Sequence, residues 1–337
     1  MYKFEVIDIN NPKWEIIVKS SAKYDFYHTS FYHKIDNNFS SLLFVAEDEL
    51  DFLALPLVLR PIGQALWVDF TSVYGYCGPI SNRKNFDFDQ YFIDFFEFKL
   101  KEYCRENNVI SLFSRLHPLI VHQTIFRNIG EVSPINKTVA IDLKLSPEEQ
   151  KRQYRKSTKS ELNQLRRKGF YVVEAKSTED LERFIEIYYE TMDRVKASPY
   201  YYFSKEYFLS FLRNNYFQNK LLLAKFEDKI IAGAIFTITD KIMQYHLAGT
   251  TEEFIKVTPM KLILDEARLL GNDLSLDYLH LGGGVGGSDD DPLFRFKSGF
   301  SKSCFQFSVW KYIFNEEVYN QLSENKGDSS FFPLYRS

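Results

Sequence analysis

The chain of 337 residues has few cysteines, and their spacing excludes two classes of protein. Cys77, Cys104 and Cys304 stand far apart, and the sequence holds neither a CxxC pair nor a Cys/His cluster. A zinc-binding module and a disulfide framework both need such spacings. Free thiols in a reducing compartment are therefore expected, and we predict no bound metal.

Long apolar runs are also absent. No stretch reaches the roughly 20 apolar residues that a helix needs to cross a bilayer. The N-terminal segment MYKFEVIDINNPKW lacks the apolar centre of a signal peptide. We therefore expect a cytoplasmic protein without membrane insertion.

An excess of positive charge is missing as well. The chain has 42 Lys and Arg residues against 45 Asp and Glu residues, a formal net charge of −3. A bulk nucleic-acid binder would carry a strongly basic domain, so no nucleic-acid partner is expected. No GK[ST] phosphate loop is present, and GGGVGG at 282–287 has no βαβ unit after it, which argues against a dinucleotide site.

Two similar apolar segments are present, one in each half of the chain. LLFVAEDELDFLALPLVL covers 42–59 and LLLAKFEDKIIAGAIFTI covers 221–238. Each has two apolar runs around a short charged turn, which predicts a β-hairpin. The length is sufficient for two ordinary domains. We therefore predict two tandem domains, 1–145 and 146–337, of mixed α/β class.

The second half begins with a helix signal. Ser146, followed by Pro and then by Glu149, is typical of a helix start. The pattern predicts one helix from there to about Lys168, ending at Gly169. Further helices are expected after Ser177, in the FSKEYFLSFLRNN segment and over 260–271, with strands between them.

Basic residues and two histidines are candidate functional groups. The segment 150–168 has eight basic residues and one acid, Glu161. It is either a polyphosphate or tRNA-backbone site or a solvated helix face. His246 and His280 lie on predicted strands that flank helix 260–271. Each is either a general base or a buried structural histidine.

Four segments together resemble one family. They follow one another in the order found in the Fem-like transferases, which have two tandem GCN5-related N-acetyltransferase (GNAT) domains. In chain order the segments are VDFTSVYGYCGPI, YRKSTKSELNQLRRKGFYVVEA, YHLAGTTEEFIKVTPMKLILDEA and HLGGGVGGSDDDPLFRFKSGFS. The resemblance implies two GNAT-like domains and an acyltransferase, with the second domain holding the donor. A QxxGxG/A pyrophosphate loop is absent, and the matching stretch is GTTEEFIKVTPM.

The resemblance implies that an amine attacks a thioester or an aminoacyl ester directly, without an acyl-enzyme. The leading interpretation is transfer of a short acyl group from acyl-CoA to a dTDP- or UDP-linked deoxyamino sugar for surface polysaccharide synthesis. One alternative is an aminoacyl-tRNA-dependent Fem-type transferase acting on a peptidoglycan precursor. Another is a non-catalytic binding protein with this fold.

The resemblance also implies roles for individual residues. His246 is the expected base, and Lys297 the expected cation at the developing charge. Thr258, Pro259 and Met260 would start a helix whose N-terminus faces the donor phosphates. The expected donor-binding residues are Leu247, Gly249, Thr250, Lys256, Thr258, Met260, Lys261, Gly282, Gly283 and Lys297. The expected acceptor-binding residues are Tyr74, Tyr76, Arg155, Lys159, Arg194, Tyr201, Tyr202 and His280.

Overall fold

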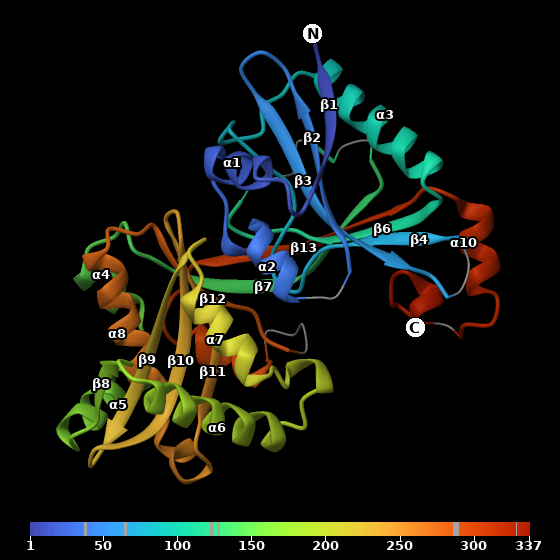
Figure 1. Cartoon of the computed structure of the whole chain (residues 1–337). Helices are drawn as coiled ribbons and strands as arrows, with labels where there is room; N and C mark the ends of the chain where they lie inside the picture. The colour runs from blue at the N-terminus through green and yellow to red at the C-terminus, as the bar shows by residue number, and fades with distance from the viewer. Residues whose placement is uncertain (37–38, 64–65, 121–124, 127–128, 286–289, 328) are drawn as a thin grey trace. The chain divides into compact units, whose positions relative to one another are not determined.

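The structure, a computed structural model, divides the chain into two compact units (Figure 1). It describes residues 1–36, 39–63, 66–120, 125–126, 129–285, 290–327 and 329–337. Unit 1 comprises Met1–Asn136 and Gln306–Ser337, and unit 2 comprises Lys137–Phe305. The single division predicted at residues 145/146 differs from these units, because the C-terminal segment belongs to unit 1.

Unit 1 is a sheet with helices on both faces. Its strands are β1 (Lys3–Asp8), β2 (Ser41–Glu47), β3 (Phe52–Pro61), β4 (Val68–Thr71), β5 (Ile80–Ser81), β6 (Val109–Arg115) and most of β13 (Cys304–Ile313). Its helices are α1 (Lys13–Ser20), α2 (Ser30–Asp36), α3 (Gln90–Glu106) and α10 (Glu316–Ser323), with short 3-10 turns η1 (Phe26–His28) and η4 (Leu334–Arg336).

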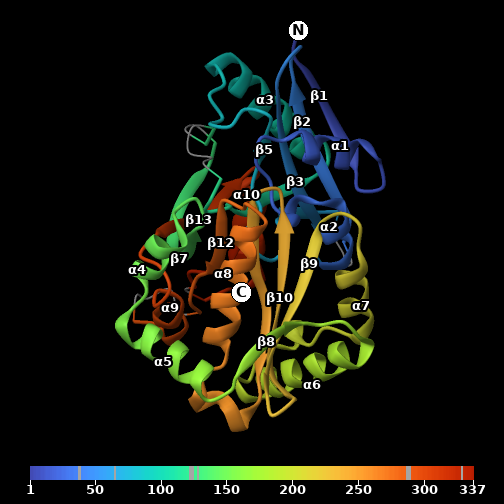
Figure 2. The same ribbon diagram turned by 90° about the vertical axis from the view of Figure 1, so that its left-hand side faces the viewer.

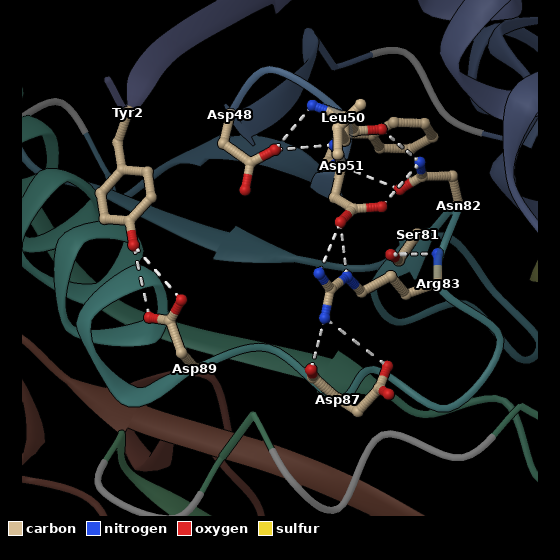
Figure 3. Close-up of polar contacts among 10 residues, drawn as sticks. Tyr2, Asp48, Leu50, Asp51, Ser81, Asn82, Arg83, Asp87 and Asp89 are labelled. Carbon is tan, nitrogen blue, oxygen red and sulfur yellow. Dashed lines mark hydrogen bonds and ion pairs between the residues drawn. The ribbon is translucent and has the colours of Figure 1, made fainter.

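Both faces of the β2–β3 hairpin are buried, which explains why its sequence is a continuous apolar run rather than an alternating one. Leu43 and Val45 pack with α1, whereas Phe44 and Ala46 pack with α3. The turn is held by side chains (Figure 3). The Asp48 carboxylate accepts hydrogen bonds from the backbone N–H groups of residues 50 and 51, both 2.8 Å long.

Unit 2 has the same kind of architecture. Its strands are β8 (Tyr171–Glu174), β9 (Gln218–Phe226), β10 (Lys229–Thr239), β11 (Ile242–Thr250), β12 (Tyr278–Gly282) and the C-terminal half of β7 (Glu131–Asp142). Its helices are α4 (Pro147–Gln153), α5 (Lys156–Arg167), α6 (Thr178–Arg194), α7 (Lys205–Arg213), α8 (Met260–Asp273) and α9 (Pro292–Lys297), with 3-10 turns η2 (Pro199–Tyr201) and η3 (Glu252–Val257).

Helices α6 and α7 cover one face of this sheet, and α5 and α8 cover the other (Figure 2). Alternate residues of β10 show the division. Ala232 and Ala234 belong to the core that α8 and α5 complete. A Cβ on Gly233, between them, would meet the Phe184 ring of α6 at 2.6 Å. The predicted mixed α/β class is confirmed.

The strand order is the same in the two units. In unit 1 the sequence of neighbours is β1-β2-β3-β4-β6-β13, and in unit 2 it is β8-β9-β10-β11-β12-β7. In both sheets the first three pairings are antiparallel, the fourth is parallel and the fifth is antiparallel. The predicted hairpins 42–59 and 221–238 are therefore β2–β3 and β9–β10, in equivalent positions.

The last strand of each sheet is exchanged along the chain. Strand β7 follows the β6 strand of unit 1 in sequence but pairs with β12 of unit 2. Strand β13 follows β12 in sequence but pairs with β6 of unit 1. A single cut near residue 145 therefore cannot separate two complete sheets.

The basic segment forms two helices, so the prediction of one helix from 147 to 168 is wrong. Ser146 caps α4 through the predicted capping box with Glu149. The chain then breaks at Tyr154, whose buried hydroxyl donates a 2.8 Å hydrogen bond to Asp265. Arg155 instead donates its backbone N–H to the carbonyl of Gly299, at 2.9 Å. Tertiary contacts thus override the helical pattern.

Candidate functional site

Strands β11 and β12 of unit 2 part from each other partway along their length. Their parallel pairing covers three rungs and ends with Gln244 opposite His280. Beyond that rung β11 stays paired with β10 up to Thr250, while β12 stays paired with β7 up to Gly282. The described strands therefore form a V-shaped opening, here called the wedge.

A β-bulge marks the place where the strands part. Leu247 lies opposite Ile235, but Tyr245 lies opposite the next residue, Phe236, so His246 is the extra residue of β11. Bulges bend a strand and change the direction of its side chains. The bulge thus explains why β11 leaves β12 at this point.

The bulge and the strand alternation place His246 on the face covered by α7. Its ring stacks on Phe211 with centroids 4.8 Å apart and planes 16° apart. Burial lowers the pKa of His246 to about 3, so the ring is neutral at physiological pH. Tyr245 packs on the opposite face, against the core formed with α8.

Lys297 lies at the wedge, at the end of α9. Its ammonium donates a 2.7 Å hydrogen bond to the carbonyl of Gly283, just beyond β12, and lies 5.8 Å from the centroid of the Tyr245 ring. The residue is only 7% exposed. Burial lowers its pKa to about 7, against the opposing influence of Asp291. Lys297 and His246 therefore face opposite sides of the sheet.

Short-range packing holds α9 and Lys297 in place. Gly282, the last residue of β12, has a φ of 76°, a conformation that favours glycine. A Cβ on Gly284 would lie 2.2 Å from Oδ1 of Asp291. That same carboxylate caps α9 by accepting the N–H of Phe294. The glycine-rich segment therefore permits close packing, and residues 286–289 lie outside the described ranges.

His280 closes the apex of the wedge. It is fully buried, and its Nδ1 lies 2.6 Å from the Oε1 of Gln244 at the last rung. The pair joins the two strands through their side chains before they separate. An acceptor-binding role for His280 stays a prediction.

The start of α8 already holds a carboxylate. Glu161 of α5 forms an ion pair with Lys261, and its Oε2 accepts a 3.1 Å hydrogen bond from the Thr258 hydroxyl. Thr258 has a left-handed backbone, and Met260 is buried in the core. The predicted donor-phosphate residues Thr258 and Lys261 are thus engaged by Glu161, whereas Lys256 is exposed.

The far end of β11 is tied to α6. The backbone N–H of Thr250 bonds to the Thr191 hydroxyl at 3.0 Å, and the Thr250 carbonyl accepts from the Arg194 guanidinium at 3.1 Å. Gly249 allows close approach, since a Cβ there would lie 2.8 Å from the carbonyl oxygen of Ile187. Arg194 therefore lies at the end of β11.

The other predicted acceptor-binding cations lie on α5 and just before it. Arg155 is exposed, and its guanidinium donates a 3.3 Å hydrogen bond to the Ser298 hydroxyl, next to Lys297. The Lys159 ammonium bonds to the carbonyl of Arg152 at 3.4 Å. Arg155 and Arg194 therefore have different neighbours, Ser298 for the first and Thr191 and Thr250 for the second.

The predicted tyrosines are divided between the units. In unit 1, Tyr74 is 41% exposed, with the Arg115 guanidinium 5.8 Å from its ring centroid, and Tyr76 packs edge-on against Phe307. In unit 2, the Tyr201 carbonyl accepts from Tyr188, and Tyr202 donates to Asp193. Their acceptor-binding roles stay predictions.

The equivalent place in unit 1 is closed. Beyond the last β4–β6 rung, the Ser72 N–H bonds to the Phe113 carbonyl and the Ser72 hydroxyl accepts from the Arg115 N–H, both at 3.1 Å. Further along, the backbone of Cys77 forms an isolated parallel β-bridge with that of Leu116. The described part of unit 1 therefore has no counterpart of the wedge between its parallel strands.

The described residues offer neither a metal site nor a membrane-spanning helix. No group of three or more His, Cys, Asp or Glu side chains there could hold a metal ion, and no helix there is long and apolar enough to cross a membrane. Sequence reasoning missed Glu161 as an individual residue. Its only signal was its isolation, as one acid among eight bases.

A family model matches most of unit 2. Residues 152–297 match the family model described as an acetyltransferase (GNAT) domain. This confirms the predicted enzyme class, an acyltransferase. Because unit 1 repeats the strand order of the matched unit, the predicted tandem GNAT-like fold is confirmed as well. No curated protein matches the chain in sequence.

Solved structures share the fold at low sequence identity. A crystal structure of FemX has a TM-score of 0.74 at 11% identity, covering 94% of this chain and 99% of that one. L-PGS from Bacillus licheniformis has a TM-score of 0.61 at 13% identity, with 92% and 93% covered. The C-terminal domain of a putative lysylphosphatidylglycerol synthetase from Agrobacterium fabrum has a TM-score of 0.56 at 11% identity, with 86% and 88% covered.

Proposed function

We propose that the chain is an N-acyltransferase whose reaction takes place in the wedge of unit 2. The observation that carries this proposal is Lys297, a buried amine at the point where β11 and β12 part. Attack on an acyl group places negative charge on its carbonyl oxygen. A positioned cation in a site of low dielectric constant stabilises that charge strongly.

The proposed reaction has one tetrahedral intermediate. The acceptor nitrogen forms a bond to the carbonyl carbon, and the C=O electron pair moves onto oxygen, where the Lys297 ammonium donates a hydrogen bond. Collapse of the intermediate breaks the bond to the donor sulfur or oxygen, which leaves with that electron pair. The acceptor nitrogen loses its proton to solvent, to the substrate or to a protein base. We propose no acyl-enzyme, since Cys304 is an exposed residue at the start of β13.

We propose acyl-CoA as the donor and a dTDP- or UDP-linked deoxyamino sugar as the acceptor, in surface polysaccharide synthesis. GNAT domains use acyl-CoA, and the diverging edges of β11 and β12 suit a pantetheine arm. Arg155 and Arg194 are the guanidinium groups proposed to bind the acceptor diphosphate, because a guanidinium matches phosphate geometry.

A second candidate donor is an aminoacyl-tRNA, with a peptidoglycan precursor as acceptor. The observation that favours it is the surface of α4 and α5, whose exposed cations suit a phosphate backbone. These are Lys151, Arg152, Arg155, Lys156, Arg166, Arg167 and Lys168.

The test is a matrix of donors and acceptors with mass spectrometry of the products. Acyl-CoA thioesters and aminoacyl-tRNAs are each offered dTDP- and UDP-amino sugars and a peptidoglycan precursor. We expect a product with the acyl-CoA and amino-sugar pair and its loss in Lys297→Met. A product only with aminoacyl-tRNA would select the second candidate. No acylated product in any combination would refute the proposal.

A further inference from the structure

The start of α8 has few groups left with which to bind a phosphate. A GNAT-type domain would bind the donor diphosphate at this helix start through free N–H groups. Here three backbone N–H groups already donate to backbone carbonyls. Thr258 donates to Ile255, Lys261 to Thr258 and Leu262 to Pro259. Pro259 itself has no N–H.

Glu161 supplies the negative charge at this position instead. Its carboxylate binds both the Lys261 ammonium and the Thr258 hydroxyl. The Lys261 side chain is only 12% exposed, so the ion pair shields it from a ligand. An acidic group at a helix N-terminus is favourable for the helix dipole. A diphosphate arriving here would meet a carboxylate of like charge.

Contacts between α5 and α8 fix the position of Glu161. Arg166, five residues further along α5, donates 2.8 Å hydrogen bonds to Asp265 and Glu266 of α8. Leu162 and Leu165 of α5 are buried in the core that α8 completes. These contacts hold the backbone of α5 against α8, so the Glu161 side chain starts from a fixed position beside the start of α8.

We infer that Glu161 determines donor specificity by excluding a diphosphate from the start of α8. This inference rests on the proposed function and refines it. The donor is recognised by its acyl group and pantetheine arm, and its diphosphate adds little affinity. The chain should therefore bind a pantetheine compound about as well as the corresponding CoA compound.

The test measures binding of free CoA and of pantetheine by calorimetry. For the wild-type protein we expect dissociation constants within about threefold of each other. In Glu161→Ala, Lys261 is released, and a new charge-assisted contact should tighten CoA binding by about tenfold or more. Pantetheine binding should not change. Glu161→Gln keeps the size of the side chain and should show a smaller gain of the same sign.

Glu253→Ala is the matched control. Glu253 is exposed on η3, so its removal changes the net charge near α8 without releasing Lys261. An equal gain in this control would overturn the inference, because general electrostatics would then explain it. So would a wild-type preference of tenfold or more for CoA, or the absence of any gain in both Glu161 variants.

The two proposals can fail separately. If the Glu161 variants gain CoA affinity but no donor and acceptor pair gives an acylated product, the proposed function fails and this inference stands. If acyl transfer occurs but Glu161→Ala and Glu161→Gln bind CoA like the wild type, only the inference fails. Circular dichroism of each variant verifies that it is folded.

Discussion

Lys297 is a costly residue for a protein to bury. A lysine at 7% exposure loses most of its hydration, and here the backbone carbonyl of Gly283 accepts a hydrogen bond from the ammonium. Burial favours the neutral amine and lowers the pKa to about 7. Near neutral pH both the ammonium and the amine are therefore populated, which makes the site sensitive to small changes in pH.

The first prediction concerns the pH dependence of acyl transfer. If the ammonium form of Lys297 stabilises the oxyanion, kcat/KM should fall as pH rises through about 7. Lys297→Met should lower kcat/KM by roughly 10²–10³-fold and remove that alkaline limb. Rates measured between pH 5.5 and 9 decide this. An unchanged alkaline limb in the variant would exclude Lys297 as its source.

The second prediction concerns His246, which the sequence suggested as the base. Its pKa of about 3 makes the imidazole a weak proton acceptor, and it faces α7 rather than Lys297. We expect His246→Gln to keep kcat within about tenfold, with the acid limb of the pH profile intact. A loss of roughly 10²–10⁴-fold, the range for a general base, would restore the role suggested by the sequence.

The sequence identified candidate residues more readily than it showed which way their side chains point. The family resemblance identified Lys297, and the structure places it at the wedge. No pattern could show that a bulge at His246 would put it on the other face, because a one-residue insertion changes strand alternation without any signal in composition. Glu161 went unrecognised because its partners lie about 100 residues further along the chain.

At the scale of elements, α8 is tied to α4 and α5 by a buried polar network. Arg268 is fully buried and donates to Asp265 at 3.0–3.1 Å, to the Tyr154 hydroxyl at 2.9 Å and to Gln150 at 3.1 Å. Arg166 reaches the second oxygen of Asp265. Since every partner is satisfied by another, the network specifies one arrangement of the three helices.

The third prediction follows from this network. Arg268→Met leaves the Asp265 carboxylate with a weakened set of partners, and breaking a buried ion pair costs about 3–5 kcal/mol. We expect thermal unfolding to shift down by roughly 10 °C. Arg183→Met, which removes an exposed ion pair with Glu186, should leave the melting temperature nearly unchanged. Equal melting temperatures for both variants would contradict the network's role.

Element types followed from local signals more reliably than their ends. Capping residues Ser146 and Ser177 gave the starts of α4 and α6, and the two hairpins were recognised by their apolar runs. The break at Tyr154 was missed, since it depends on a hydrogen bond to a residue of α8. A helical pattern carries no information on such distant partners.

At the scale of the whole molecule, the described part of unit 1 contains three buried neutral histidines. Burial lowers the pKa of His28 to about 4 and that of His33 and His117 to about 3. Their ordinary value is 6.5. Below pH 6.5 these histidines therefore bind protons in the unfolded chain, whereas in the folded chain they stay neutral. Stability is fully present above that pH and is lost as pH falls towards 4.

The fourth prediction puts a size on this loss. These three groups and His246, whose pKa burial lowers in the same way, together reduce the free energy of unfolding by about 7 kcal/mol between pH 7 and pH 5, a large part of a typical stability. Denaturant titrations at several pH values, followed by near-ultraviolet circular dichroism, measure it. His33→Gln should reduce the pH slope by about a quarter, and a flat profile from pH 7 to 5 would rule out the linkage.

The fifth prediction concerns truncation. Residues 309–313 of β13 pair with β6, and Trp310 is fully buried in the core of unit 1, where its indole donates to the Ile129 carbonyl at 2.6 Å. A fragment ending at residue 136 should not give a cooperative unfolding transition. Adding 306–337 through a flexible linker after residue 136 should restore one. A cooperative transition for the short fragment alone would contradict this.

The strand exchange also has a consequence for biosynthesis. A ribosome releases the first 136 residues long before it makes residues 306–337, so the N-terminal sheet emerges with an unfilled edge at β6 and a core lacking its tryptophan. Exposed edges and apolar surface invite aggregation. Chaperones would need to bind the nascent chain until translation ends. A premature stop codon almost anywhere would leave both units incomplete.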